Sequence, residues 1–153
     1  MQQVQDGGGR HGASRRRPTL VVVASVRPVP ISVGDAIAEL TFLPDRTPTV
    51  EAERSAEAFR RLSAYRDGAI FVGHWAGASE WERHTVGDEI VMVVEGATTI
   101  FFLDGDSEHS ATLRSGELVV VPCGTWHRFE TPQEVKVLSV TPQPTDHTAD
   151  RPT

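Results

Sequence analysis

The sequence contains little cysteine, little lysine and no long apolar run. Cys123 is the only cysteine, so the chain cannot form an intramolecular disulfide and gives no sign of an oxidising compartment. Lys136 is the only lysine, and nearly all other basic residues are arginine. No apolar run approaches the roughly 18 residues that a membrane-spanning helix needs. These scarcities exclude a disulfide-stapled domain and a transmembrane helix.

The chain also lacks an excess of positive charge. It has 15 Lys and Arg against 21 Asp and Glu, which gives a formal net charge of −6. Nucleic-acid binding needs a positive surface, so we predict small-molecule partners and neither nucleic acid nor a membrane. Ser14–Arg17 followed by Leu20–Val26 superficially resembles a twin-arginine export signal, but the apolar stretch is short and Arg27 interrupts it. We therefore expect a cytoplasmic protein.

Length and composition indicate one globular domain. The chain has 153 residues, of which 39% are hydrophobic and 24% charged, as in ordinary soluble domains. We expect residues 1–18 to form a disordered tail and residues 19–68 to supply a strand and helices that pack on a β-barrel. The barrel itself is predicted to span residues 69–144, and residues 145–153 are predicted to form a C-terminal tail.

Four elements are predicted before the barrel. The β-branched segment Leu20–Val26 favours an edge strand. Apolar residues at helical spacing behind a capping serine predict a short helix over Ser32–Leu40. Two prolines indicate a loop over Phe42–Pro48, and an amphipathic stripe predicts a second helix over Glu51–Tyr65.

From Ala69 onward the sequence changes to short β-rich segments separated by turn residues. This pattern is typical of an antiparallel sandwich or barrel, so we predict an all-β fold with one or two short N-terminal helices. The predicted strands lie near Ile70–Trp75, Ser79–His84, Ile90–Val94, Thr98–Leu103, Ser110–Leu113, Leu118–Val121, Trp126–Phe129 and Val135–Thr141.

Four acidic and histidine side chains are placed to converge. Glu82 and His84 are two residues apart on a predicted strand, so both point to the same face. Glu89 begins the next strand after a turn, and hairpin pairing would bring it beside His84. His127 follows a turn that contains proline and glycine and can redirect a strand into the barrel.

The spacing of these residues resembles the first sequence motif of the cupin superfamily. Glu82, His84, Glu89 and Gly96 reproduce its spacing, and Gly77 lies one residue nearer than the motif asks. The departure is Glu82, which stands where the motif has its first metal-binding histidine. The resemblance extends to small bacterial single-domain cupins that carry a Trp-Glu-Arg-His segment followed by Gly-Asp-Glu.

The second cupin motif follows in the correct order. Gly116, Pro122, Gly124 and His127 match its positions, and Thr131 stands where the motif has asparagine. The two motifs together span roughly residues 69–141. The resemblance therefore implies a small jelly-roll β-barrel and a homodimer.

The resemblance also implies one divalent metal ion bound by Glu82, His84, Glu89 and His127. A dication with two carboxylates and two imidazoles forms a neutral centre, and its oxygen ligands favour Fe(II) or Mn(II), although Zn or Ni can occupy purified protein. The alternative is a barrel that keeps the fold without the ion. Burying two carboxylates together without a cation would cost several kcal/mol, so we predict the metal site.

As an enzyme, the protein would act on a small organic molecule as an oxygenase, isomerase, cyclase or lyase. Glu82 could act as the general base. His74 lies on the same face of its predicted strand as Ile70 and Val72, so it could line the cavity as an acid or base. The simpler interpretation of His74 is a packed strand residue. The alternative function is a barrel that binds or senses a small ligand without turnover.

Overall fold

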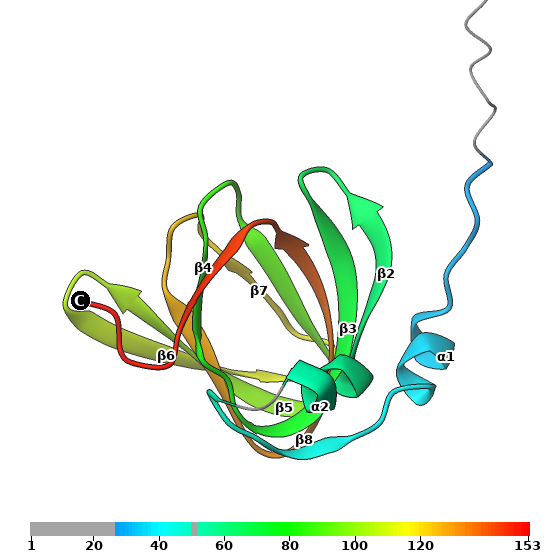
Figure 1. The fold of residues 1–153 in the computed structure, drawn as a ribbon, viewed down its shortest axis with the longest axis horizontal. Coiled ribbons are helices and arrows are strands. Elements are labelled where there is room, and N and C mark those ends of the chain that lie inside the picture. Colours follow the sequence, from blue (N-terminus) through cyan, green and yellow to red (C-terminus); the bar gives the residue numbers. More distant parts are fainter. Residues whose placement is uncertain (1–26, 50–51) are drawn as a thin grey trace, which may run out of the picture.

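A computed structural model describes residues 27–49 and 52–153 (Figure 1). The described chain is mostly β, as predicted, with nine strands in one connected sheet that curves back on itself. Two short helices lie at one side, and neither is long and apolar enough to cross a bilayer. The predicted tail and the predicted strand Leu20–Val26 lie outside the described residues.

The elements follow one another in a simple order. The helices are α1 (Val33–Ala38) and α2 (Ala52–Ala58). The strands are β1 (Leu43–Arg46), β2 (Phe59–Tyr65), β3 (Gly68–Ala78), β4 (Trp81–His84), β5 (Glu89–Asp104), β6 (Ser107–Arg114), β7 (Leu118–Val121), β8 (His127–Pro142) and β9 (Thr145–Thr148).

Two long strands, β5 and β8, connect the layers of the fold. The first half of β5 pairs with β7 and with the end of β8, and its second half pairs with β6 and with the start of β8. Register shifts after Val93 and Gly96 let β5 bend between these partners. The predicted turn between Ile90–Val94 and Thr98–Leu103 is therefore a bend within one strand.

The helix predicted over Ser32–Leu40 is present as α1. The hydroxyl of Ser32 accepts a hydrogen bond from the backbone N–H of Asp35 at 3.3 Å, as expected of an N-terminal cap. The helix buries Ile37 in a small cluster that also contains Val72 of β3. This cluster covers the outer face of β3.

The helix predicted over Glu51–Tyr65 is only half correct. It ends at Ala58, and Phe59–Tyr65 instead forms β2, which pairs antiparallel with β3 through a tight turn before Gly68. The helical spacing of apolar residues was misleading because pairing with a long neighbouring strand outweighs local propensity.

Two predicted irregular segments also form strands. Leu43–Arg46, predicted as a loop, pairs in parallel with β3 as an edge strand, where Pro44 costs little because an edge N–H needs no partner. Thr145–Thr148, predicted as tail, pairs with the otherwise free edge of β4 as β9. Arg83 of β4 also forms an ion pair with Asp146 of β9. The local sequence could not reveal that β1 pairs with β3 or that β9 pairs with β4.

The main core lies between the curved layers. Its buried residues come from strands β1, β3, β5, β6, β7 and β8 and from the end of α2. They are Leu43, Ala58, Trp75, Val91, Val93, Ile100, Leu113, Val121, Phe129, Val135 and Val137.

Candidate metal site

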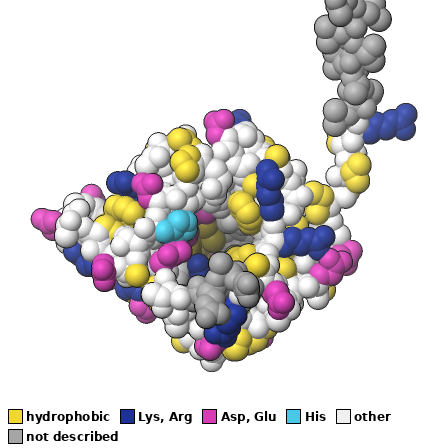
Figure 2. Space-filling view, viewed as in Figure 1, with side chains coloured by type: hydrophobic (Ala, Val, Ile, Leu, Met, Phe, Trp, Pro, Cys, Tyr) yellow, Lys and Arg dark blue, Asp and Glu magenta, His cyan; other side chains and the backbone are white. Residues whose placement is uncertain are grey.

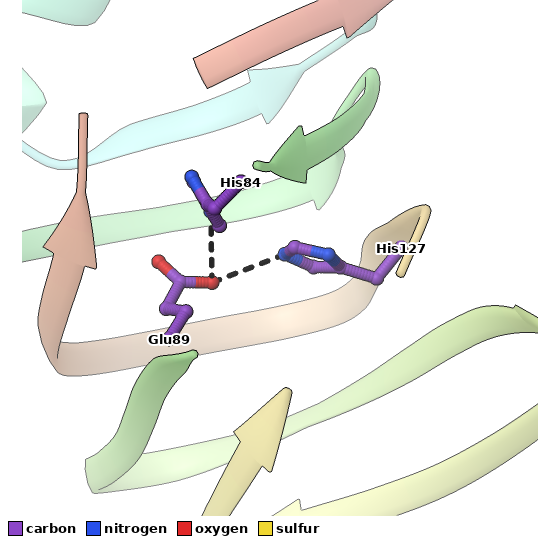
Figure 3. A group of neighbouring side chains, drawn as sticks. All are labelled: His84, Glu89 and His127. Atoms are coloured by element: carbon purple, nitrogen blue, oxygen red, sulfur yellow. Dashed lines mark hydrogen bonds and ion pairs between the residues drawn. The ribbon is translucent and has the colours of Figure 1, made fainter. Parts of the chain in front are cut away.

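Three side chains from different strands meet inside the fold. His84 ends β4, Glu89 begins β5 and His127 begins β8 (Figure 3). Oε2 of Glu89 lies 3.1 Å from Nε2 of His127 and 3.4 Å from Nε2 of His84. One ligand atom from each residue lies within 4.8 Å of the other two, so the cluster could hold a metal ion.

The chain fixes the outward-facing nitrogen of each imidazole. Nδ1 of His127 donates to the backbone carbonyl of Thr125 at 3.1 Å, and Nδ1 of His84 lies 3.1 Å from the hydroxyl of Thr145 in β9. When Nδ1 carries the proton, Nε2 keeps its lone pair. Both lone pairs are then available inside the cluster, as metal-binding histidines require.

A hydrogen bond from a neighbouring strand also fixes the carboxylate of Glu89. Its Oε1 accepts a 2.6 Å hydrogen bond from the hydroxyl of Thr141, which is itself 2.8 Å from the hydroxyl of Ser139. This leaves Oε2 to face the two histidines. Each residue of the cluster thus directs one oriented donor atom to a common point.

One atom in the cluster has no hydrogen-bond partner among the described residues. It is Nε2 of His84, whose side chain is 2% exposed. Buried polar atoms in folded proteins almost always find a partner, because leaving one unpaired costs roughly 1–3 kcal/mol. A cation bound between the two imidazoles and Glu89 would satisfy this atom, so the residues present fit a divalent metal ion.

Glu82 lies beside this cluster. It pairs with His127 across β4 and β8, and its Oε1 lies 3.5 Å from Nε2 of that histidine. Its side chain is 19% exposed, against 4% for Glu89. The structure therefore brings three of the four predicted ligands, His84, Glu89 and His127, together in one buried group, and places Glu82 beside His127 on the solvent side.

The buried charges shift one another strongly. Burial by itself would raise the pKa of Glu89, but interactions with His127 and His84 outweigh it and bring this pKa to about 2. Burial would likewise lower the pKa of His127, but Glu82 and Glu89 raise it to about 10. The metal-free cluster therefore holds a proton on His127, which an incoming cation must displace.

His74 lies away from the cluster, contrary to the prediction that it lines the cavity. It shares the parity of Val72, as expected, but that face of β3 points toward α1 and β1. There His74 packs against Phe42 and forms an ion pair with Glu134 at 2.7 Å. The neighbouring residues Phe71, Gly73 and Trp75 line the cavity instead. Alternation along β3 shows which residues share a face, but it does not show which of the two faces lines the cavity.

A cavity of about 260 Å³ adjoins the cluster. The space-filling view shows a hollow in this face of the molecule, with histidine, acidic and basic side chains around it (Figure 2). Glu82, Glu89 and Thr141 line it on the side of the cluster, and Arg46 of β1 lines it as well. Burial lowers the pKa of Arg46, while the charges of Glu82 and Glu80 act in the opposite direction.

Sequence reasoning missed Arg46, Thr141 and Thr145 as residues of the site. Arg46 stands in a proline-rich segment with no local signal, because only the pairing of β1 with β3 brings it to the cavity. Thr145 reaches His84 only because β9 pairs with β4. Both depend on long-range strand pairing, which spacing within a motif does not report.

Comparison with known proteins finds a family model and a curated relative that match part of this chain. Residues 73–141 match the family model described as "Cupin domain". The uncharacterized protein YdbB of Bacillus subtilis (strain 168) is 30% identical over 67 residues, which are 44% of this chain and 57% of that relative. The chain thus spans less than two thirds of the length of this curated relative.

Solved structures support the fold. A cupin-2 domain containing protein from Shewanella frigidimarina has a TM-score of 0.56 and 23% identity, covering 74% of this chain and 94% of that one. Protein NMB1881 from Neisseria meningitidis has a TM-score of 0.54 and 18% identity, covering 78% of this chain and 100% of that one. At these identities the likeness concerns the fold alone, and the predicted jelly-roll architecture is confirmed.

Proposed function

We propose that this chain is a mononuclear metal-binding cupin that acts on a small organic molecule, because residues 73–141 match the cupin family model and the fold is similar to that of a solved cupin-2 domain protein. His84, Glu89 and His127 hold one divalent ion, and Glu82 is the fourth ligand. The observation that carries this proposal is the buried Nε2 of His84, which has no hydrogen-bond partner among the described residues and lies 3.4 Å from the carboxylate of Glu89.

The charge of the ligands bears on the choice of ion. Two carboxylates and two neutral imidazoles balance a dication, and carboxylate oxygens suit Fe(II) or Mn(II) better than Cu. We propose Fe(II) or Mn(II) in the cell. Zn or Ni can replace them during purification, since intrinsic affinity follows the Irving–Williams order.

The residues around the proposed metal site form the cavity in which a substrate would bind. A bound divalent ion would provide a Lewis acid that polarises a substrate oxygen. Val91, Phe129 and Val137 form an apolar part of the wall of the adjoining cavity. Alternatively, Glu82, which lines the same cavity and is partly exposed, leaves the metal, and its carboxylate accepts a proton from a substrate as general base. Such a site suits oxygenase, isomerase, cyclase or lyase chemistry.

Metal titration tests the proposal directly. Protein stripped with a chelator and titrated with Mn(II) in a calorimeter should bind one ion per chain. His84→Ala and His127→Ala should each weaken binding at least about 100-fold, because each removes a ligand. His109→Ala is the matched control, since His109 is exposed on β6 and stacks only on Phe102. Absence of saturable binding, or equal loss in the control, would reject the metal site.

Turnover is tested separately. The metal-loaded protein is incubated with enols, catechols and keto acids while oxygen uptake and absorbance are followed. Consumption of one substrate, abolished by His127→Ala, supports an enzyme. A compound that binds and is recovered unchanged would instead favour a barrel that binds its ligand without turnover.

A further inference from the structure

Arg46 is the one basic side chain among the residues that line the cavity of the proposed metal site. It ends β1, whose last residue pairs with Gly77 of β3. Its guanidinium lies 5.0 Å from the ring centre of Phe59 and 5.2 Å from that of Trp75. These rings are in tilted contact with each other, so they form a wall that fixes the position of the guanidinium.

This guanidinium has no ion-pair or hydrogen-bond partner among the side chains that the structure describes. Other arginines do find carboxylates, as Arg54 does with Asp45 and Arg83 with Asp146. Glu80 and Glu82 are near enough to influence the charge of Arg46 but form no ion pair with it. A partly buried guanidinium with open donors is poised to bind an anion.

Trp75 lines the same cavity, but its indole N–H is enclosed. The indole Nε1 of Trp75 is buried and has no hydrogen-bond partner among the described residues. Buried indole N–H groups usually have one. Because this indole nitrogen has almost no accessible surface, the donor that a ligand oxygen meets on this wall is the guanidinium of Arg46.

We propose that Arg46, held against the rings of Phe59 and Trp75, binds the carboxylate of a small organic acid in this cavity. The inference deepens the proposed function, on which it rests, by naming the substrate class of the same site. The planar guanidinium matches a carboxylate with two parallel hydrogen bonds. Three carboxylates, those of Glu80, Glu82 and Glu89, also line the cavity and disfavour a dianion such as a phosphate ester. The apolar wall suits a small hydrocarbon body.

Benzoate and benzamide form a suitable pair of probes, because they have nearly the same shape and differ in charge. Each is titrated calorimetrically into wild-type protein, first metal-free and then loaded with Mn(II). Benzoate should bind, and benzamide should bind at least about 10-fold more weakly, since it lacks the charge that Arg46 recognises. This comparison needs no variant, so it does not depend on the folding of a mutant.

Arg46→Gln should weaken benzoate binding by about 10- to 100-fold while Mn(II) affinity stays within about 2-fold of wild type. Arg54→Gln is the matched control, because Arg54 pairs with Asp45 at the surface and does not line the cavity. It should leave benzoate binding unchanged. Circular dichroism confirms that both variants are folded.

The outcomes separate this inference from the metal proposal. Mn(II) binding together with benzoate binding that persists in Arg46→Gln would overturn the inference and leave the metal site standing, because the ion alone would then hold the carboxylate. Benzoate binding that depends on Arg46 in protein that binds no Mn(II) would reject the metal and support the anion site. Equal affinity for benzoate and benzamide would overturn the role of charge.

Discussion

The hydroxyl of Thr145 is a single contact on which a proposed ligand depends. It lies 3.1 Å from Nδ1 of His84 and holds this imidazole with its other nitrogen toward Glu89. We predict that Thr145→Val weakens Mn(II) binding by about 10-fold, because an outer hydrogen bond that orients a ligand contributes roughly that much to affinity. Competition with a fluorescent chelator measures it.

Thr148→Val is the control for this prediction. Thr148 lies on the same strand, and its hydroxyl donates to the backbone carbonyl of Asp150, away from the cluster. The substitution should leave Mn(II) affinity unchanged. If both variants lose affinity equally, the loss arises from β9 as a whole and not from the contact with His84.

The positions of His84, Glu89 and His127 could be predicted because two motifs encode them locally. Strand alternation places Glu82 and His84 on one face. The hairpin pairing expected to bring Glu89 beside His84 is wrong, because β4 pairs with β8 and β9 whereas β5 pairs with β6, β7 and β8. Glu89 reaches His84 through the curvature of the sheet and not through a shared hairpin. Strand alternation did not place His74 correctly, because this residue does not line the cavity. Alternation says which residues share a face but not which face is inner, and that depends on what packs against β3.

At the scale of the element, the position of Arg46 depends on the close approach of β1 to β3. Gly77 has φ of +107°, and a Cβ placed there would lie 2.2 Å from the backbone oxygen of Arg46. Gly77→Ala should destabilise the protein by more than about 3 kcal/mol, because backbone strain adds to a clash that backbone atoms cannot easily relieve. Urea unfolding measures the loss.

Gly105→Ala separates these two causes. Gly105 also has a positive φ, of +59°, but a Cβ at this residue would meet no atom of the described chain within 4 Å. This substitution should cost only the conformational term, about 1–2 kcal/mol. Equal losses in both variants would show that contact between β1 and β3 contributes nothing, and Arg46 would then need another support.

The elements that were predicted correctly are those with local signals. Ser32 marks the start of α1, and alternating residues mark the strands from β3 onward. The edge strands β1, β2 and β9 were missed or misassigned, since each exists through pairing with a distant strand. Apolar periodicity in Phe59–Tyr65 fitted a helix as well as a strand, and only the partner decided the outcome.

At the scale of the whole molecule, metal binding should stabilise the fold. His84, Glu89 and His127 come from three different strands, so an ion bound between them cross-links β4, β5 and β8. We predict that saturating Mn(II) raises the melting temperature of chelator-treated protein by several degrees, as ligand binding to the folded state requires. The same addition should leave the melting temperature of His127→Ala unchanged. An equal rise in this variant would place the ion elsewhere.

The buried charges also make metal-free stability depend on pH. Because the pKa of His127 is raised from 6.5 to about 10, its protonation stabilises the fold fully below pH 6.5, and this contribution is lost as pH rises toward 10. The pKa of Glu89 is lowered from 4.5 to about 2, so its contribution is present above pH 4.5 and is lost as pH falls toward 2. The metal-free protein should therefore be most stable between these limits.

The ion and the proton on His127 compete, so the benefit of the metal should grow with pH. As pH rises from 6.5 toward 9, metal-free protein loses the contribution of protonated His127, whereas metal-bound protein holds this histidine neutral over the same range. The difference in melting temperature with and without Mn(II) should widen over this range at constant ionic strength. In His127→Gln the alkaline decline of the metal-free protein should disappear. A difference that stays constant with pH in the wild type would mean that His127 carries no proton for the ion to displace.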